Sequence, residues 1–426
     1  MNQDMYQPRI ADRLLAAALR RAGAVQIVGP KWCGKTTTAE QATVEAVYFQ
    51  DPDRRAGYRQ LASVQPSALL AGRKPKLLDE WQDVPTVWDA VRFAVDRDPT
   101  PGQFVLTGSS VPTTDEVRHS GTGRFAKVAM RPMTLFESGE SSGEVSLEHL
   151  ADGADIAGQG TSAVGDLAAA ICRGGWPAAV QREPDTWGAL AADYVDSLVE
   201  SDVSRVDGVE KNPRRVRTLM RSLARNESTE AAMTTLQADM ATDEAALPHN
   251  RISTNTISVY LTALRRLYVV DDQEAWAPAV RSKAAIRTSP VRRFCDPSIA
   301  AALLGLTPDT LLVDFNTFGL LFESLCVRDL RVYAEASGAG VFHYRDARDL
   351  ECDAVVEWPD GRWGAIEVKI DPRHEDDAAT TLLKLGRLVR SQHGGPPIFL
   401  AVVTATGFAY RRPDGVYVLP ITCLGP

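Results

Sequence analysis

The stretch Gly29-Pro30-Lys31-Trp32-Cys33-Gly34-Lys35-Thr36 matches the pattern G-x-x-x-x-G-K-[S/T] without a substitution. A short apolar run at 24–28 precedes it, and residues 37–43 can continue a helix after it. This order of strand, glycine-bent loop and helix directs backbone N–H groups and the positive end of a helix at a phosphate. The stretch therefore predicts a phosphate-binding P-loop rather than a chance Gly-Lys-Thr turn.

The predicted loop gives each of its residues an expected role. Lys35 is expected to reach the β- and γ-phosphates of ATP, and the Thr36 hydroxyl to bind Mg²⁺. The expected cofactors are therefore ATP and Mg²⁺. The expected nucleotide-binding residues of this loop are Gly29, Pro30, Lys31, Trp32, Cys33, Gly34, Lys35, Thr36 and Thr37.

Length and composition limit the class of protein. A chain of 426 residues is long enough for two or three domains. Its hydrophobic fraction of 44% and charged fraction of 24%, with no long apolar run, predict a soluble, cytoplasmic protein without membrane contact. The net charge of -8 argues against a surface coated with phosphate-binding residues, so nucleic acid would have to meet a local basic face.

A second apolar run ends in two acids. Residues 76–80 read as a strand that delivers Asp79 and Glu80 at its carboxyl end, where ligands bind in parallel α/β sheets. Asp79 is expected to hold Mg²⁺, and Glu80 to orient or deprotonate the attacking water. The alternative is a strand capped by surface acids, which the P-loop upstream makes less favourable.

Further polar residues follow the next strand, 103–108. Thr107 and Ser109 are candidates for sensing the γ-phosphate, or else belong to an ordinary Gly/Ser turn. Arg124, on a glycine-flanked segment, is either an arginine finger acting in cis or in trans, or a surface residue. Arg9 either reaches the nucleotide or is a solvated residue at a helix start.

The motifs occur in an order that resembles a known family. They are the segments 6–9, 29–36, 77–82, 106–110, 123–124 and 132–137. This set resembles a prokaryotic family of AAA-type P-loop ATPases with a C-terminal domain of formerly unknown function. The resemblance implies an AAA-like ATPase domain over residues 1–137, but it supplies no substrate.

The middle of the chain is predicted in two parts. Residues 138–165, rich in Gly, Ser and acids, read as a flexible linker or insertion. Residues 166–290 predict a helical and winged-helix-like domain. Its third helix is either a DNA-reading helix or a unit that packs against protein. The available DNA contacts are Arg251, Asn255, Arg265 and Arg266.

The last segment, 291–426, carries a second candidate site. Glu323 interrupts an apolar helix, Asp353 opens a strand, and Glu367 and Lys369 share one face of the next strand. This helix acid, strand acid and E-x-K order resembles the PD-(D/E)xK nuclease superfamily. The resemblance implies that Asp353 and Glu367 bind Mg²⁺ and that Lys369 supports phosphodiester cleavage.

Together these patterns predict an α/β chain with an AAA-like P-loop domain, a helical and winged-helix-like middle, and a PD-(D/E)xK-like C-terminal domain. The predicted activity is ATP hydrolysis, with nuclease activity left open. The predicted catalytic residues are Lys35, Asp79, Glu80, Arg124, Glu323, Asp353, Glu367 and Lys369. The alternative is a nucleotide-gated switch with a catalytically silent C-terminal domain. Candidate partners are DNA, another protein and a second copy of the chain.

Overall fold

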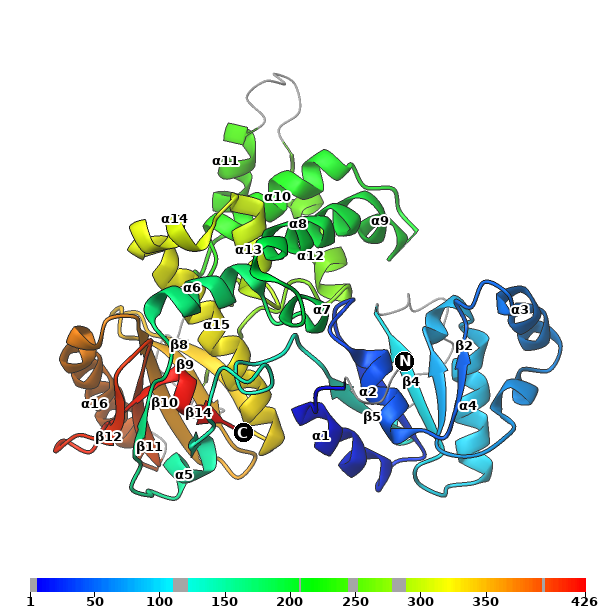
Figure 1. Cartoon of the computed structure of the whole chain (residues 1–426), viewed down its shortest axis with the longest axis horizontal. Coiled ribbons are helices and arrows are strands. Elements are labelled where there is room, and N and C mark those ends of the chain that lie inside the picture. The colour runs from blue at the N-terminus through cyan, green and yellow to red at the C-terminus, as the bar shows by residue number, and fades with distance from the viewer. Residues whose placement is uncertain (1–5, 110–121, 207, 244–251, 278–288, 393–394) are drawn as a thin grey trace. The chain divides into compact units, whose positions relative to one another are not determined.

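The structure is a computed structural model that describes residues 6–109, 122–206, 208–243, 252–277, 289–392 and 395–426 (Figure 1). It divides into two compact units. The first consists of residues 1–132, 200–211 and 260–269, and the second of the remaining chain. Both units contain a β-sheet with helices, which confirms the predicted α/β class. In the described part, no helix is long and apolar enough to cross a membrane.

The first unit contains a five-stranded sheet in the order β2-β3-β4-β1-β5, and every pair of neighbours is parallel. All five carboxyl ends therefore meet at one edge. Because β4 lies between β1 and β3, the P-loop and the acids after β3 flank the end of β4. The strands are β1 (Ala24–Val28), β2 (Glu45–Tyr48), β3 (Lys76–Asp79), β4 (Phe104–Gly108) and β5 (Phe125–Ala129).

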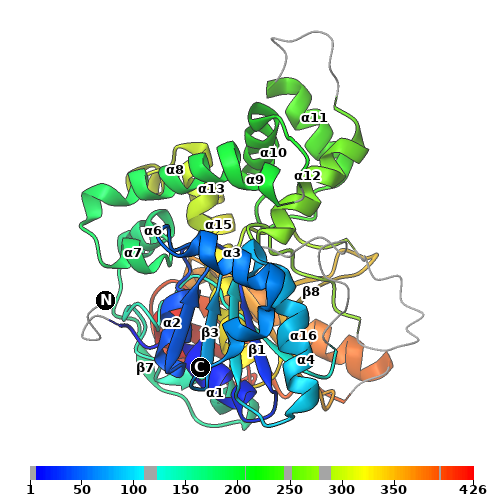
Figure 2. The same ribbon diagram turned by 90° about the vertical axis from the view of Figure 1, so that its right-hand side faces the viewer.

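Helices cover both faces of this sheet (Figure 2). The helices are α1 (Ile10–Leu19), α2 (Lys35–Ala42), α3 (Arg55–Val64) and α4 (Thr86–Arg97). Ile27 belongs to one core cluster with Leu15 of α1, whereas Leu106 belongs to another with Trp88 of α4. This division follows from the alternation of side chains along each strand, and it makes a three-layer α/β/α sandwich.

The second unit contains a seven-stranded mixed sheet in the order β7-β12-β13-β11-β10-β9-β8. The strands β8, β9 and β10 form an antiparallel meander, and helix α16 (Glu375–Gln392) then connects β10 to its parallel neighbour β11. The strands are β7 (Gly158–Gln159), β8 (Gly340–Arg345), β9 (Glu351–Glu357), β10 (Trp363–Lys369), β11 (Phe399–Thr404), β12 (Phe408–Arg411) and β13 (Tyr417–Pro420). Leu382 and Leu385 of α16 pack on Ala365 and Val402 of the sheet.

Among the remaining helices of the second unit, α6, α8, α10 and α15 contact a short helix, α13. Their bounds are α6 (Val164–Arg173), α7 (Pro177–Val180), α8 (Trp187–Ser197), α10 (Pro213–Arg225), α11 (Met233–Asp243), α13 (Pro297–Leu304), α14 (Pro308–Val313) and α15 (Phe315–Ala336). Asp296 caps α13, accepts a hydrogen bond from the Gly175 N–H at 3.0 Å, and pairs with the buried Arg328 at 2.8 Å. Two further helices are α9 (Val203–Arg205), in the first unit, and α12 (Thr254–Arg266), whose residues fall in both units.

Residues 138–165 differ from the expected flexible linker. They form β6 (Val145–Ser146), α5 (Leu147–Ala151) and β7, and β6 pairs with β14 (Leu424–Gly425) while β7 pairs with β12. The Ser141 hydroxyl also donates to the Leu424 carbonyl at 2.7 Å. The backbone of this polar segment is held by the end of the chain, which no local pattern indicates.

The three helices expected in the middle of the chain are present as α10, α11 and α12. After α12, antiparallel bridges join Val270 to Phe294 and Gln273 to Val291. Residues 278–288, between these bridges, and Arg251 lie outside the described residues. The winged-helix arrangement therefore stays a prediction.

Candidate functional site

The P-loop follows β1 directly and depends on two glycines. A Cβ on Gly29 would lie 2.2 Å from the Met130 carbonyl oxygen, so only glycine fits there. Gly34 has a φ of 99°, in the left-handed region, where the loop turns into helix α2. The two positions curl the backbone between them, as the motif requires.

Lys35 lies folded into this loop. It is buried, and its Nζ donates to the carbonyl oxygens of Gly29 at 2.9 Å and Pro30 at 2.7 Å. This ammonium lies at the amino end of helix α2. There it can give up the two carbonyl oxygens and bind phosphate oxygens instead.

Other loop residues differ in their surroundings. Cys33 is buried, whereas Trp32 is exposed with a φ of 65°. Thr37 follows in the first turn of α2 and is half-buried. Lys31 pairs with Asp202 at 2.6 Å, a contact that joins two segments of the first unit 171 residues apart in sequence. The sequence alone gave no signal for this pair.

Asp79, the last residue of β3, and Glu80, the residue after it, meet hydroxyl groups from the neighbouring elements. Asp79 Oδ1 accepts hydrogen bonds from Thr36 Oγ1 at 2.7 Å and from Thr107 Oγ1 at 2.6 Å. A carboxylate beside a hydroxyl that opens helix α2 supplies the hard oxygen ligands that Mg²⁺ prefers. The donor set at Thr36 and Asp79 therefore fits the expected metal.

Glu80 lies at the same edge of the sheet. It takes a left-handed backbone conformation with a φ of 53° and accepts hydrogen bonds from Gln82 and, at 3.2 Å, from Ser109 Oγ. Burial raises the pKa of Glu80, and the nearby positive charge of Lys35 opposes the rise. The structure thus brings together Thr36, Asp79, Glu80, Thr107 and Ser109, which the sequence could only place at separate strand ends.

Arg124 does not lie with the P-loop of its own unit. Its carbonyl oxygen accepts from Ala24 N, at the amino end of β1, and its guanidinium pairs with Asp96 of α4 at 2.6 Å. The five residues of β1, about 16 Å of strand, separate it from Gly29. The expectation of a finger acting in cis is therefore wrong, because the glycine-flanked segment enters β5 from the opposite edge. A role in trans stays a prediction.

Arg9 has a position that neither expectation described. Its side chain is buried, and the guanidinium donates to the Cys33 carbonyl at 2.7 Å and to the Arg131 carbonyl at 2.8 Å. It is therefore not a solvated residue, and its guanidinium contacts the backbone of the P-loop and of the segment after β5. The only sequence signal for this contact with the P-loop is that Arg9 lies shortly before the loop in the chain.

The C-terminal acids are also brought together. Lys369 Nζ donates to Glu367 Oε2 at 2.8 Å and lies 3.7 Å from Asp353 Oδ2. Asp353 Oδ2 accepts from the Val368 N–H at 2.7 Å, across the β9–β10 pair. Burial, followed by the charge of Asp353, raises the pKa of Glu367 well above its usual range and that of Glu323 to about 7.

A buried arginine that the sequence did not single out supports this cluster. Arg293 pairs with Glu323 at 2.5 Å and donates to Gln273, whose amide donates in turn to the Asp353 carbonyl at 2.9 Å. In the described part of the chain, no group of three or more His, Cys, Asp or Glu residues is arranged as a metal site. Glu367 Oε1 is nevertheless buried without a hydrogen-bond partner, and an oxygen of this kind fits a cation.

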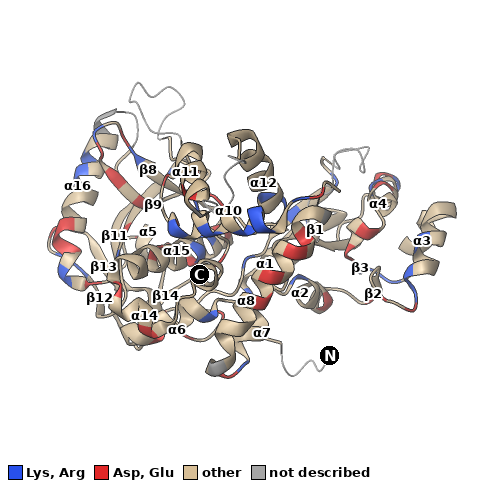
Figure 3. Ribbon diagram, turned by 90° about the horizontal axis from the view of Figure 1, so that it is seen from above, with Lys and Arg blue, Asp and Glu red and all other residues tan. Residues whose placement is uncertain are grey.

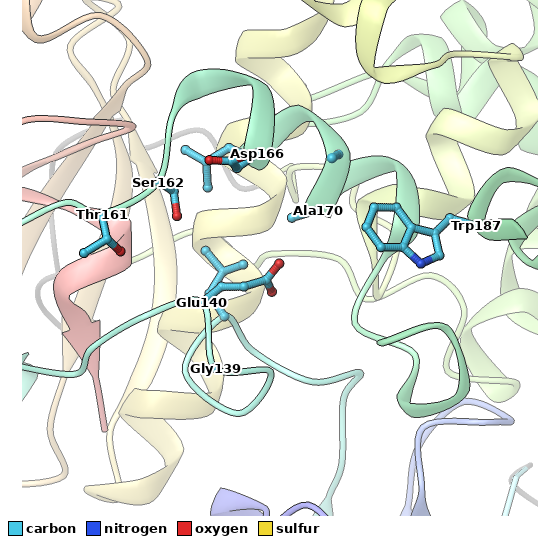
Figure 4. Close-up of a pocket in the computed structure, with 10 residues that line it drawn as sticks. Gly139, Glu140, Thr161, Ser162, Asp166, Ala170 and Trp187 are labelled. Carbon is cyan, nitrogen blue, oxygen red and sulfur yellow. The ribbon is translucent and has the colours of Figure 1, made fainter. Parts of the chain in front are cut away.

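A pocket of about 370 Å³ lies in the second unit, apart from these residues (Figure 4). Glu140, Asp166 and Trp187 line it with small and apolar residues. Its two acids are engaged already: Arg173 donates to both oxygens of Glu140, and Asp166 accepts from the Ala163 N–H. The lining therefore offers no charged group without a partner for a ligand.

A glycine-bent loop after β1, the carboxylate of Asp79 at the end of β3 and the polar end of β4 are the arrangement of a P-loop nucleotide-binding domain. Residues 21–138 match the family described as AAA domain. Two further matches are to families described as domains of unknown function, DUF8612 over residues 164–310 and DUF4143 over residues 318–424. The match over residues 21–138 confirms the predicted AAA ATPase domain.

Relatives and solved structures cover most of the chain. Uncharacterized proteins Rv2008c of Mycobacterium tuberculosis and Mb2031c of Mycobacterium bovis are each 24% identical over 375 residues, covering 86% of this chain and 74% of theirs. The Walker-type ATPase PABY2304 of Pyrococcus abyssi is 15% identical with a TM-score of 0.45, covering 71% of this chain and 97% of that one. The ORC2 protein of Aeropyrum pernix, in ADPNP-ADP complexes, is 14% identical with a TM-score of 0.34, covering 72% and 94%. The ORC1 protein of Aeropyrum pernix, solved in complex with DNA, is 12% identical with a TM-score of 0.28, covering 74% and 97%.

Proposed function

We propose that this protein hydrolyses ATP with Mg²⁺ and couples its nucleotide state to a C-terminal domain of nuclease fold that acts on or binds DNA. The observation that carries the ATPase part is the contact of Thr36 and Thr107 with one oxygen of Asp79, beside the loop that holds Lys35. Hydroxyl, carboxylate and ammonium groups there come from three neighbouring strand ends.

In this proposal Thr36 and Asp79 hold Mg²⁺, which neutralises negative charge on the phosphates when bound. Glu80 takes a proton from a water molecule, whose oxygen bonds to the γ-phosphorus as the bond to the β-phosphate oxygen breaks. ADP and inorganic phosphate leave. Lys35 binds phosphate oxygens, while Thr107 and Ser109 hold the two acids in place.

For the C-terminal domain we propose that Asp353 and Glu367 bind a divalent cation and that Lys369 and Glu323 complete the site. The order of α15, the β8–β9–β10 meander and the α16 crossover supports a PD-(D/E)xK-like fold. The buried Glu367 oxygen without a partner supports a cation there. A bound cation would polarise the phosphodiester, and Lys369 would stabilise the charge that develops on its oxygens.

Substitution of Lys35 tests the ATPase part. Lys35→Ala is expected to abolish ATP binding or turnover, because it removes the buried ammonium from the loop. Lys127→Ala, an exposed lysine of β5, is the matched control and should turn ATP over at the normal rate. Unchanged ATPase activity in Lys35→Ala would refute the site.

Cleavage assays separate the proposed nuclease from the alternative. Plasmid and oligonucleotide are incubated with Mg²⁺ or Mn²⁺ and with the intact protein, Asp353→Ala or Lys369→Ala. Cutting by the intact protein that both variants lose supports the enzyme. If the intact protein does not cut, the alternative is favoured: a nucleotide-gated switch whose C-terminal domain binds a partner or DNA.

A further inference from the structure

Helix α10 concentrates positive charge in a chain whose net charge is -8. Its 13 residues, PRRVRTLMRSLAR, include five arginines and no acid. Figure 3, with Lys and Arg in blue, shows this helix from above. A helix with this charge balance attracts polyanions locally even though the whole chain is acidic.

The arginines form one face of the helix. At about 100° per residue, Arg214, Arg217, Arg221 and Arg225 fall within an arc of about 80°, spread over about 16 Å of helix axis. The opposite side is formed by Val216, Leu219, Met220 and Leu223, which are all buried. Because packing fixes the apolar side towards the core, the arginine face is held towards solvent.

The arginines of this face differ in their partners. Arg217 pairs with Asp196 of α8 at 2.5 Å. Within the described residues, the exposed side chains of Arg214 and Arg221 make no ion pair or hydrogen bond. These two guanidinium groups, seven residues apart on the same face, are therefore available to an external anion.

From these observations we propose that the arginine face of α10 binds the phosphate backbone of duplex nucleic acid. Guanidinium groups match phosphate oxygens with two parallel hydrogen bonds, and a row of them follows a row of phosphates. The helix carries no aromatic residue that could stack on exposed bases, so a duplex is favoured over a single strand, and binding is independent of sequence. This inference rests on the proposal that the chain acts on or binds DNA, and it places the contact outside α12.

A binding titration with matched variants tests this inference. A labelled duplex of random sequence is titrated by fluorescence anisotropy in EDTA, over a series of salt concentrations. Arg214→Gln/Arg221→Gln is compared with Arg55→Gln/Arg59→Gln, which removes the same charge from exposed positions on α3. The α10 variant should bind several-fold more weakly, with a salt slope reduced by about 2, because each lost phosphate contact lowers the slope by about 1. The α3 variant should bind like the intact protein.

Three other outcomes overturn the proposal: equal weakening in both variants, no change in either, or binding of polyglutamate without binding of the duplex. Arg214→Lys/Arg221→Lys keeps both charges and should bind more tightly than the Gln pair, which separates the loss of charge from a folding defect. Because EDTA prevents metal-dependent cutting, the result does not depend on nuclease or ATPase activity. If the intact protein binds the duplex through these arginines in EDTA but does not cut DNA in the cleavage assay, only the proposed nuclease is refuted.

Discussion

Arg9 illustrates how one side chain can determine the shape of a binding loop. Its guanidinium ties the carbonyl of Cys33, within the P-loop, to that of Arg131, just after β5. Both acceptors are backbone groups, so the contact fixes the path of the loop rather than a particular side chain. We therefore expect Arg9 to act on nucleotide binding through the position of the loop.

We predict that Arg9→Ala weakens ADP binding by roughly tenfold, or about 1.4 kcal/mol, because the loop loses two charge-assisted hydrogen bonds that hold its shape. Arg9→Lys keeps the charge but not the forked geometry of the guanidinium. Its affinity for ADP should lie between that of the intact protein and that of Arg9→Ala. Titration with a fluorescent ADP analogue measures the effect. Arg13→Ala, an exposed position on α1, is the control, and a similar loss there would contradict the prediction.

A second prediction concerns Glu80 and pH. Because burial raises the pKa of Glu80, its carboxylate, the proposed base, is protonated at a higher pH than that of an ordinary glutamate. The rate of ATP turnover at saturating ATP should therefore fall on acidification well before an exposed carboxyl would titrate. Glu80→Gln should bind ATP but not hydrolyse it. Full turnover by this variant would show that another group acts as the base.

Some residues of the candidate sites have neighbours that a sequence pattern predicts, and others have neighbours that no pattern predicts. The P-loop, Asp79, Glu80, Thr107 and Ser109 lie at the carboxyl ends of strands in one parallel sheet, so strand order was enough to bring them together. Arg9 and Arg124 depend on partners that no local pattern indicates, namely two carbonyl groups and Asp96. The same holds for Arg293 beside Glu323, and for residues 138–165, whose backbone pairs with the end of the chain.

At the scale of the elements, a buried acid joins the end of α10 to α15. Glu227 accepts hydrogen bonds from Ser324 Oγ at 2.6 Å and from the Phe294 N–H at 3.1 Å. Burial raises the pKa of Glu227 to about 8. Folding therefore favours the protonated form of this carboxyl, whereas the unfolded chain titrates near an ordinary value.

From this difference we predict how stability depends on pH. A carboxyl whose pKa is raised by folding destabilises the fold increasingly as pH rises from its unfolded pKa to about 8, and by a constant amount above that. The melting temperature of Glu227→Gln should thus exceed that of the intact protein by a margin that grows over this range and then levels off. Glu148→Gln, an exposed acid of α5, should show no such trend. A margin that shrinks with pH would contradict the assigned direction.

At the scale of the whole molecule, the chain holds two units with separate cores. Since the proposed ATP site lies in the first unit, we predict that ATP raises the unfolding transition of that unit and leaves the transition of the other unchanged. At a concentration of 100 times Kd, a ligand stabilises the form that binds it by about 2.7 kcal/mol. Calorimetry with and without a nonhydrolysable analogue measures this shift. Lys35→Ala should abolish it, and an equal shift of both transitions would contradict the prediction.

The ATPase unit is not a continuous piece of chain, because residues 200–211 and 260–269 return to it after long excursions into the other unit. A gene fragment cut after the AAA match would encode a protein without Asp202, and Lys31 would lose its partner. The ends of each excursion are covalently anchored in the nucleotide-binding unit. Helix α10 begins at Pro213, just after the returning segment 200–211 ends, so the arginine face and the nucleotide-binding unit are neighbours along the chain.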